Sequence, residues 1–201
     1  MTACQPLCVL MVGLPGSGKT RLARALEAQG YLRVCPDEEM FRRHGRYGLD
    51  FPRGSYLVRE RPILDELGVA VGASLRSGTS VVFDHGLWTP AEREEWRAIA
   101  HRAGAVPVLV YLPVPHDELW QRIRVRNDDW ARDPNSIFFS EEDLRRFAGR
   151  FFPPLSEEVH LIYDGRPERI IASLNSGRLD GCHETPAAES DSGVPDCQQR
   201  V

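Results

Sequence analysis

The sequence predicts an α/β protein, in which a parallel β-sheet carries helices on both faces. Residues 13–20 have the form G-x-x-x-x-G-K-[ST], and the apolar run at 7–12 before them is typical of a buried strand. Strand-like and helix-like patterns then alternate along the chain, which favours parallel pairing with helical crossovers. With 201 residues, of which 42% are hydrophobic, the chain is long enough for one domain with a substantial core.

The first half of the chain predicts three strands separated by helices. Gly30 ends the helix after the glycine loop, and Pro36 opens the next helix, which ends near Gly45. Apolar residues at helical spacing predict a third helix, with Pro62 in its first turn. The predicted strands are 7–12, 31–35 and 80–83, the last ending on Asp84; the helices are about 20–29, 36–45 and 62–78, and 44–55 is an ordered loop.

The second half continues the alternation. Thr89-Pro90-Ala91-Glu92 is a capping box with proline at the first helical position, and Gly104 ends the helix that it begins. The predicted strands are 106–112 and 159–163, and the helices are about 89–104, 116–127, 140–151 and 166–174. We therefore expect a domain over residues 1–175. The Gly-, Pro-, Ser- and acid-rich composition predicts a disordered acidic tail over 176–201.

Charge and cysteine content narrow the function classes. The net charge is −4, and the tail alone carries five acidic residues against two arginines, which counts against a large nucleic-acid surface but allows a local basic groove. The five cysteines lack the spacing of a zinc site and indicate a reducing, cytoplasmic location. We expect no signal peptide and no membrane span, because the apolar run at 7–12 is short and leads directly into the glycine loop.

The glycine loop is predicted to bind the phosphates of a nucleotide. Its glycines let the backbone turn tightly and aim N–H groups at phosphate oxygens, and the N-terminus of the following helix adds positive potential. Lys19 is predicted to reach the β- and γ-phosphates, and Thr20 to offer its hydroxyl to Mg²⁺. The predicted nucleotide-binding residues of this loop are Gly13, Pro15, Gly16, Ser17, Gly18, Lys19 and Thr20.

Two aspartates follow predicted strands, at the sheet edge where ligands of parallel sheets bind. Asp37 either caps the next helix or acts as a general base that takes a proton from an acceptor hydroxyl. Asp84 either holds Mg²⁺, binds an acceptor hydroxyl or is a turn residue at the strand end. His85, Trp88 and Tyr47 are further candidates for the acceptor pocket, with core packing as the alternative for Trp88.

Arginines form a third set of candidates. Arg122 and Arg126 lie four residues apart, on one face of a predicted helix, and Arg124 points elsewhere. A guanidinium can bind phosphate oxygens in a fork and stabilise charge during transfer, so we predict that both bind nucleotide and that Arg126 is catalytic. Arg93, in the helix after Asp84, either braces a site carboxylate or lies on the surface.

In this order the motifs resemble the P-loop kinase group that includes chloramphenicol phosphotransferase, zeta toxins and the kinase domain of polynucleotide kinases. The resemblance spans about residues 7 to 172 and is nearest to small bacterial AAA-type ATP-binding proteins. The motifs that carry it are residues 13–20, 35–38, 82–88 with Arg93, and 122–127. It implies an adenylate-kinase-like, three-layer α/β/α core with a five-stranded parallel sheet, a helical lid at about 126–150, and Mg-ATP as the donor. It also implies that Asp37 is the catalytic base and that Arg122 and Arg126 stand at the start of the lid.

The leading hypothesis is an ATP-dependent O-phosphotransferase that moves the γ-phosphate of Mg-ATP to a hydroxyl of a small molecule. An antibiotic, as in a resistance-type kinase, or a sugar-like metabolite is the expected acceptor. A kinase for the 5′-hydroxyl of a polynucleotide or nucleoside is an alternative, with Tyr47, Phe51 and Arg53 as candidates for the stacking and charge it needs. A non-catalytic nucleotide switch, with the tail as its interaction segment, is another. The sequence indicates no oligomeric state.

Overall fold

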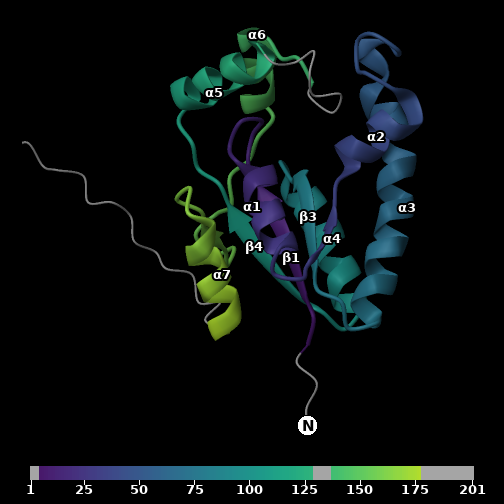
Figure 1. Ribbon diagram of the computed structural model, residues 1–201, viewed down its shortest axis with the longest axis vertical. Coiled ribbons are helices and arrows are strands. Elements are labelled where there is room, and N and C mark those ends of the chain that lie inside the picture. The colour runs from purple at the N-terminus through teal and green to yellow at the C-terminus, as the bar shows by residue number, and fades with distance from the viewer. Residues whose placement is uncertain (1–4, 129–136, 178–201) are drawn as a thin grey trace, which may run out of the picture.

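The computed structural model describes residues 5–128 and 137–177 of the chain. At its centre is a five-stranded parallel sheet with the strand order β2-β3-β1-β4-β5 (Figure 1). Central strand β1 is buried on both faces, as its unbroken apolar sequence requires. The strands are β1 (Leu7–Val12), β2 (Leu32–Val34), β3 (Val81–Gly86), β4 (Val106–Tyr111) and β5 (Leu161–Ile162).

Helices cover both faces of the sheet, which confirms the predicted three-layer α/β/α architecture. Because successive side chains of a strand point to opposite faces, Leu10 of β1 packs with helices α3 and α4, whereas Val9 packs with α1 and α7. The helices are α1 (Lys19–Glu27), α2 (Pro36–His44), α3 (Tyr56–Arg76), α4 (Pro90–Arg102), α5 (His116–Asp128), α6 (Glu141–Ala148) and α7 (Pro167–Ser176).

Two predicted boundaries are wrong. Helix α3 begins at Tyr56, so Pro62 lies inside it and not in its first turn. Proline lacks the N–H that would bond to the carbonyl of Val58, and both residues are exposed, so water can satisfy that carbonyl. Strand β3 continues past Asp84 to Gly86, because Met11 of β1 pairs with Gly86 after a shift in register.

The segment between α2 and α3 is structured, as predicted. Tyr47 and Phe51 form an isolated β-bridge, and a single 3₁₀ turn at Arg53–Ser55 leads into α3. Phe51 is buried against Met40 and Ile63, so this segment is tied to α2 and α3 by a small core of its own.

Helices α5 and α6 lie together at the end of the sheet where the glycine loop lies (Figure 1). Leu119 and Ile123 of α5 pack against Leu144 of α6, with Leu14 of the loop at their edge. Residues 129–136 of the predicted lid and residues 178–201 of the predicted tail lie outside the described part of the chain. Among the described helices, none is both long and apolar enough to cross a lipid bilayer.

Arg93 is not a surface residue. Its side chain is 1% exposed and donates two hydrogen bonds to the carboxylate of Glu158, at 2.7 and 2.8 Å, and a third to the carbonyl of Phe152 at 2.9 Å. The guanidinium therefore braces the segment between α6 and β5 and does not touch a carboxylate of the sheet edge. The helix that presents it begins with the predicted capping box at Thr89 and Glu92.

Replacing Arg93 by alanine is expected to lower the free energy of unfolding by about 2–3 kcal/mol, because the hydrogen bonds of the buried guanidinium to Glu158 and to the Phe152 carbonyl are lost while Arg97 still pairs with Glu158. Urea denaturation followed by circular dichroism measures this loss. The matched control is Arg102→Ala, at an exposed position of the same helix, which should change stability by about 0.5 kcal/mol or less. Equal stability of the two variants would contradict the bracing role.

Candidate active site

The glycine loop 13–18 joins β1 to α1 in a conformation that depends on its glycines. Gly16 and Gly18 have φ angles of +85° and +99°, in the region that L-residues with a side chain rarely adopt. Gly18 precedes α1 and supplies no side chain to cap it. The first N–H groups of α1 are thus left available for an anion, as the motif predicts.

Lys19 lies at the centre of the site. Its ammonium donates to the carbonyls of Gly13 and Leu14, at 3.1 and 2.9 Å. Burial lowers the pKa of Lys19 to about 8, while the charges of Asp84 and Asp37 oppose this shift and that of Arg126 adds to it. Two of the predicted carboxylates and one of the predicted arginines are therefore close enough to act on this ammonium.

Thr20 and Asp84 meet at the start of α1. The Thr20 hydroxyl donates to Oδ1 of Asp84 at 3.2 Å, and Asp84 is almost fully buried. Burial raises the pKa of Asp84, an effect that hydrogen bonds and charges from Arg33 and Lys19 oppose. A hydroxyl and a carboxylate oxygen are ligands that suit Mg²⁺, so this pair fits the predicted metal site.

Arg33 is a site residue that the sequence analysis missed. Its guanidinium donates to Oδ2 of Asp84 at 2.9 Å and to Glu38 at 2.8 Å. It leaves Oδ1 of Asp84 facing Thr20 and fixes the carboxylate in that orientation. A charged residue in the middle of the short apolar run 31–35 was the available signal, because such a residue needs a buried partner.

Asp37 lies in the first turn of α2 but does not cap it. No side chain caps this helix, and Oδ1 of Asp37 accepts a hydrogen bond from the Tyr56 hydroxyl at 2.5 Å. Burial and the neighbouring carboxylates Asp37 and Glu60 raise the pKa of Tyr56, so the phenol stays protonated and donates. The structure thus contradicts the capping interpretation of this aspartate, and the general-base interpretation stays a prediction.

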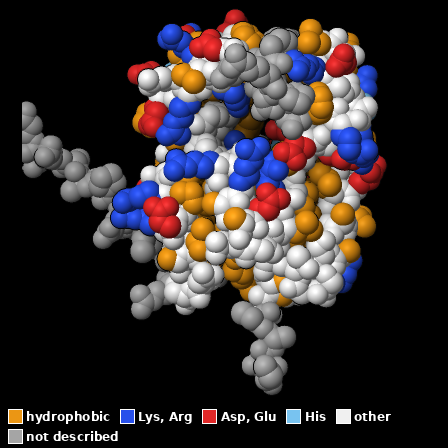
Figure 2. All heavy atoms as spheres, viewed as in Figure 1, with side chains coloured by type: hydrophobic (Ala, Val, Ile, Leu, Met, Phe, Trp, Pro, Cys, Tyr) orange, Lys and Arg blue, Asp and Glu red, His pale blue; other side chains and the backbone are white. Residues whose placement is uncertain are grey.

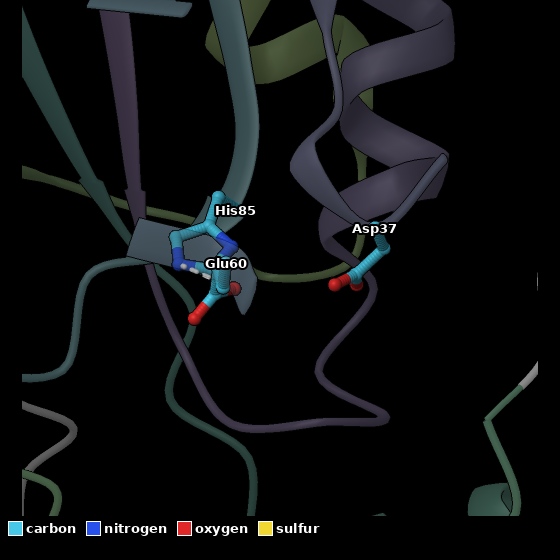
Figure 3. A group of neighbouring side chains, drawn as sticks. All are labelled: Asp37, Glu60 and His85. Atoms are coloured by element: carbon cyan, nitrogen blue, oxygen red, sulfur yellow. Dashed lines mark ion pairs between the residues drawn. The ribbon is translucent and has the colours of Figure 1, made fainter. Parts of the chain in front are cut away.

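Glu60 and His85 lie beside Asp37, and each of the three offers a ligand atom within 4.8 Å of the others (Figure 3). His85 was predicted for the acceptor pocket, whereas Glu60, near the start of α3 and before the predicted start of that helix, was missed. Burial, followed by the charges of Asp37 and Glu92, raises the pKa of Glu60 to about 8. Burial also lowers the pKa of His85, so its imidazole is neutral at physiological pH.

Trp88 and Tyr47 stand at the rim of this site. The Trp88 ring packs against Phe147 of α6, with 5.2 Å between ring centroids. This contact agrees with core packing, the alternative to a place in the acceptor pocket. Tyr47 contacts Tyr56 edge to face, also at 5.2 Å. Phe51 is only 5% exposed, so its ring is not available to stack on a nucleic-acid base. The side chain of Arg53 lies outside the described part of the structure.

Arg122 and Arg126 face the glycine loop from α5, as predicted from their spacing. Arg122 donates to the carbonyl of Gly16 at 3.1 Å and pairs with Glu118. Arg126 donates to the carbonyl of Ile137 at 3.3 Å and lies over the ring of Phe139. Figure 2 shows a hollow on this face between the α5–α6 pair and the rest of the molecule, with Lys and Arg side chains along its rim.

A cavity of about 380 Å³ lies beside the glycine loop, lined by residues 16–18, Arg122 and residues 163–165 after β5. Two buried hydroxyl groups near it, Ser17 Oγ and Tyr163 Oη, have no hydrogen-bond partner among the described residues. Buried polar atoms are rarely left without partners in folded proteins, and these two lie where a nucleotide on the loop would extend. The residues present therefore fit a nucleotide.

A family model described as "AAA domain" matches residues 8–154. The fold is similar to that of a protein from Chloroflexus aurantiacus J-10-fl, which is 22% identical with a TM-score of 0.67 over 86% of this chain and 98% of that one. It is also similar to Kti12 of Chaetomium thermophilum, solved with ADP-AlF3, at 19% identity and a TM-score of 0.63 over 85% and 98%. A gluconokinase from Sinorhizobium meliloti 1021 is 20% identical, with a TM-score of 0.54 over 90% and 95%. No curated protein matches the chain.

These likenesses confirm the predicted fold class, because all three structures are matched over nearly their whole length. Their identities to this chain are low, so the comparison concerns the fold and not the acceptor.

Replacing Glu60 by glutamine is expected to change how stability depends on pH. The pKa of Glu60 is about 8 in the folded protein against 4.5 in a model peptide, so the folded state holds this proton across that interval. Its contribution to stability is present below pH 4.5 and is lost as the pH rises through 8. Relative to the wild type, Glu60→Gln should gain on the order of 4 kcal/mol between about pH 5 and about pH 8.5, because each pH unit up to the folded-state pKa contributes about 1.4 kcal/mol.

Denaturant titrations at several pH values measure this difference. Glu94→Gln, at an exposed position of α4, is the matched control and should follow the wild-type profile. Parallel profiles for Glu60→Gln and the wild type would show that the carboxyl group titrates normally in the folded protein.

Proposed function

The chain belongs to the AAA-domain family of P-loop kinase-like ATP-binding proteins, and from this premise we propose that it is a kinase that transfers the γ-phosphate of Mg-ATP to a hydroxyl group of a small molecule. One observation carries the proposal. Asp37 is not used to cap α2. Its carboxylate lies beside Glu60 and His85, and its charge acts on Lys19. A donor-binding cation and a base are thus close together at one edge of the sheet.

On the donor side, the loop amides, Lys19 and the N-terminus of α1 would bind the phosphates. The cavity between residues 16–18 and 163–165 would take the nucleoside part. Arg122, at its border, would contact the nucleotide, and Arg126, close to Lys19, would stabilise charge on the transferred group. Thr20 and Asp84 would hold Mg²⁺, which supplies charge neutralisation on the phosphate oxygens when it is bound.

On the acceptor side, Asp37 would act as the general base. As the acceptor oxygen forms its bond to the γ-phosphorus, its proton passes to the carboxylate, and the bond from that phosphorus to the β–γ bridging oxygen breaks to release ADP. Tyr56 holds Oδ1 of Asp37 and leaves Oδ2 for this proton. His85, Trp88 and Tyr47 would border the acceptor.

The proposed acceptor is a small molecule, such as a sugar-like metabolite or an antibiotic, and not a nucleic acid. The aromatic side chains that a single-stranded nucleic acid would need for stacking are largely occupied, since Phe51 is buried and Tyr47 packs on Tyr56. The similarity of the fold to that of a gluconokinase supports a small polyol as the acceptor.

Replacing Asp37 by asparagine is expected to lower kcat by about 10²–10⁴-fold, because asparagine keeps the shape but cannot accept the proton. The affinity for ATP should stay within about threefold of the wild type, since Asp37 lies on the acceptor side. Turnover measured by coupled release of ADP, together with calorimetric titration of ATP, separates the two effects. Lys19→Ala is the contrasting variant and should lose ATP affinity; near-normal turnover of Asp37→Asn would remove Asp37 from the base role.

Replacing Arg126 by alanine is expected to lower kcat by about 100-fold or more, with a smaller effect on the KM for ATP, because a guanidinium close to the transferred group stabilises charge mainly in the transition state. The matched control is Arg124→Ala on the same helix, whose side chain is exposed and should leave both constants unchanged. Steady-state kinetics at saturating acceptor measures both. An equal loss in the two variants would indicate damage to α5 and not a catalytic role.

A further inference from the structure

The acceptor side of the site is lined by hydrogen-bond acceptors that come from three separate elements. Asp37 belongs to α2, Glu60 to α3 and His85 to the end of β3, and one ligand atom from each lies within 4.8 Å of the others. Figure 3 shows the carboxylate of Asp37 turned toward Glu60 and His85 across a short gap. The dashed line marks the 3.9 Å contact between His85 Nε2 and Glu60 Oε1, and no hydrogen bond joins any two of these three residues.

Glu60 makes this cluster unusual. The residue is 6% exposed, yet among the described residues no group donates a hydrogen bond to its side chain, and its one ion-pair contact is with His85 Nε2 at 3.9 Å. Such a distance is too long for a hydrogen bond, and the imidazole is neutral. Because its pKa is about 8, Glu60 keeps its proton at neutral pH, and a cationic ligand between the three side chains would favour the ionised form again.

The nearby cations of the described chain do not pair with Glu60. Arg33 is held by Asp84 and Glu38, and Arg59 donates to Ser55 and contacts His44. Lys19 acts on Asp37 and His85 but is bonded to the loop carbonyls, and its proposed partner is the triphosphate. The charges that act on Glu60 are those of Asp37 and Glu92, both negative. The space among the three acceptors therefore favours a positively charged ligand.

We propose that the acceptor is an amino alcohol, and that its protonated amine binds in the space between Asp37, Glu60 and His85 while a hydroxyl on the neighbouring carbon receives the phosphate. This inference rests on the proposed kinase function and names the substrate class of the same site. An ammonium group has three N–H donors, and the cluster offers one acceptor from each of three side chains. Amino sugars are the natural members of this class for a pocket of this kind.

The spacing of the cluster lies between that of a small metal site and that of an ammonium site. Three acceptors that each lie about 2.9 Å from one tetrahedral nitrogen are separated by about 4.7 Å. Neighbouring ligand atoms at about 2.0–2.2 Å from a metal ion are separated by only about 3.0–3.5 Å. The 3.9 Å between His85 Nε2 and Glu60 Oε1 lies between these two values: it is wider than the spacing of adjacent ligands on such a metal ion and shorter than the ammonium spacing, which the 4.8 Å limit of the cluster just reaches.

The two duties of Asp37 are compatible. A carboxylate has about four acceptor positions, and the Tyr56 hydroxyl takes one of them, on Oδ1. When amine and hydroxyl are on neighbouring carbons, both can reach the same carboxylate: the ammonium from the side of Glu60, and the reacting hydroxyl from the side of Lys19. Glu60 and His85 then act as binding residues that place the hydroxyl, and Asp37 alone takes its proton.

The test compares acceptors that differ only in the charge of one group. Glucosamine is compared with glucose and with N-acetylglucosamine, serinol with glycerol, and kanamycin with its N-acetylated form, each incubated with the full-length protein and Mg-ATP and analysed by mass spectrometry for the gain of one phosphate. We expect phosphorylation of one or more free amines, with kcat/KM at least about 30-fold above that of the uncharged counterpart.

Variants of the chain provide the second arm. In Glu60→Gln, the preference for the amine over its uncharged counterpart should fall to about threefold or less through a higher KM, with kcat on the amine much less affected. Glu94→Gln is the control and should keep the preference. Calorimetric titration of ATP and a thermal unfolding curve confirm that each variant is folded and binds its donor.

The outcomes separate the two proposals. Equal or better transfer to glucose, glycerol or the acetylated compounds would overturn the amine inference and leave the kinase function standing. Preference for the amine that is unchanged in Glu60→Gln would also overturn it, because the charge would then be recognised elsewhere. Transfer to no compound of either kind, by protein that binds ATP, would count against the proposed kinase function itself, and with it the inference that rests on it.

Discussion

The close contact of the glycine loop with its neighbours is the constraint on which the rest of the site depends. A Cβ on Gly86 would lie 2.7 Å from the carbonyl oxygen of Gly13, and one on Gly16 would lie 3.1 Å from that of Leu119. The end of β3 and the helix α5 therefore both reach the loop backbone without an intervening side chain. This contact fixes His85, next to Gly86, and Arg122, on α5, with respect to the glycine loop, although neither belongs to the motif at residues 13–20.

The second constraint is electrostatic. Lys19, Asp84 and Arg33 are all largely removed from water, and each is placed next to a group of opposite charge, because a buried charge without a partner would be too costly. The order Lys19, Asp84, Arg33, Glu38 alternates in sign from the loop to the surface of α2. The charge of Arg33 compensates that of Asp84. Among the described residues, the ammonium of Lys19 therefore donates to neutral carbonyls, and phosphate oxygens can replace these without breaking an ion pair.

The sequence predicted those parts of the molecule that depend on neighbours along the chain. The motif at 13–20, the capping box at Thr89, the alternation of elements and the helical spacing of Arg122 and Arg126 are local patterns, and the structure agrees with them. Glu60 could not be selected in this way, because its role comes from a contact with His85, 25 positions away. The charge of Arg33 in an apolar run indicates a buried partner but does not identify Asp84, 51 positions away. Arg93 was left between bracing a site carboxylate and lying on the surface for the same reason, since its partner Glu158 is 65 positions distant.

The difference between local patterns and contacts of distant residues also explains why the fold indicates the donor more readily than the acceptor. Backbone amides and the start of α1 bind phosphate, and their geometry follows from glycines and a helix, so it is common to all chains that contain the motif. The acceptor side consists of side chains from α2, α3 and the end of β3, and no backbone feature dictates which ones. The pairing of a buried Glu60 with a neutral His85 therefore belongs to this chain in particular, and the proposed amine acceptor rests on it. In that proposal the ammonium discriminates through charge: it would stabilise the ionised form of Glu60 beside Asp37, whereas an uncharged alcohol would leave Glu60 protonated.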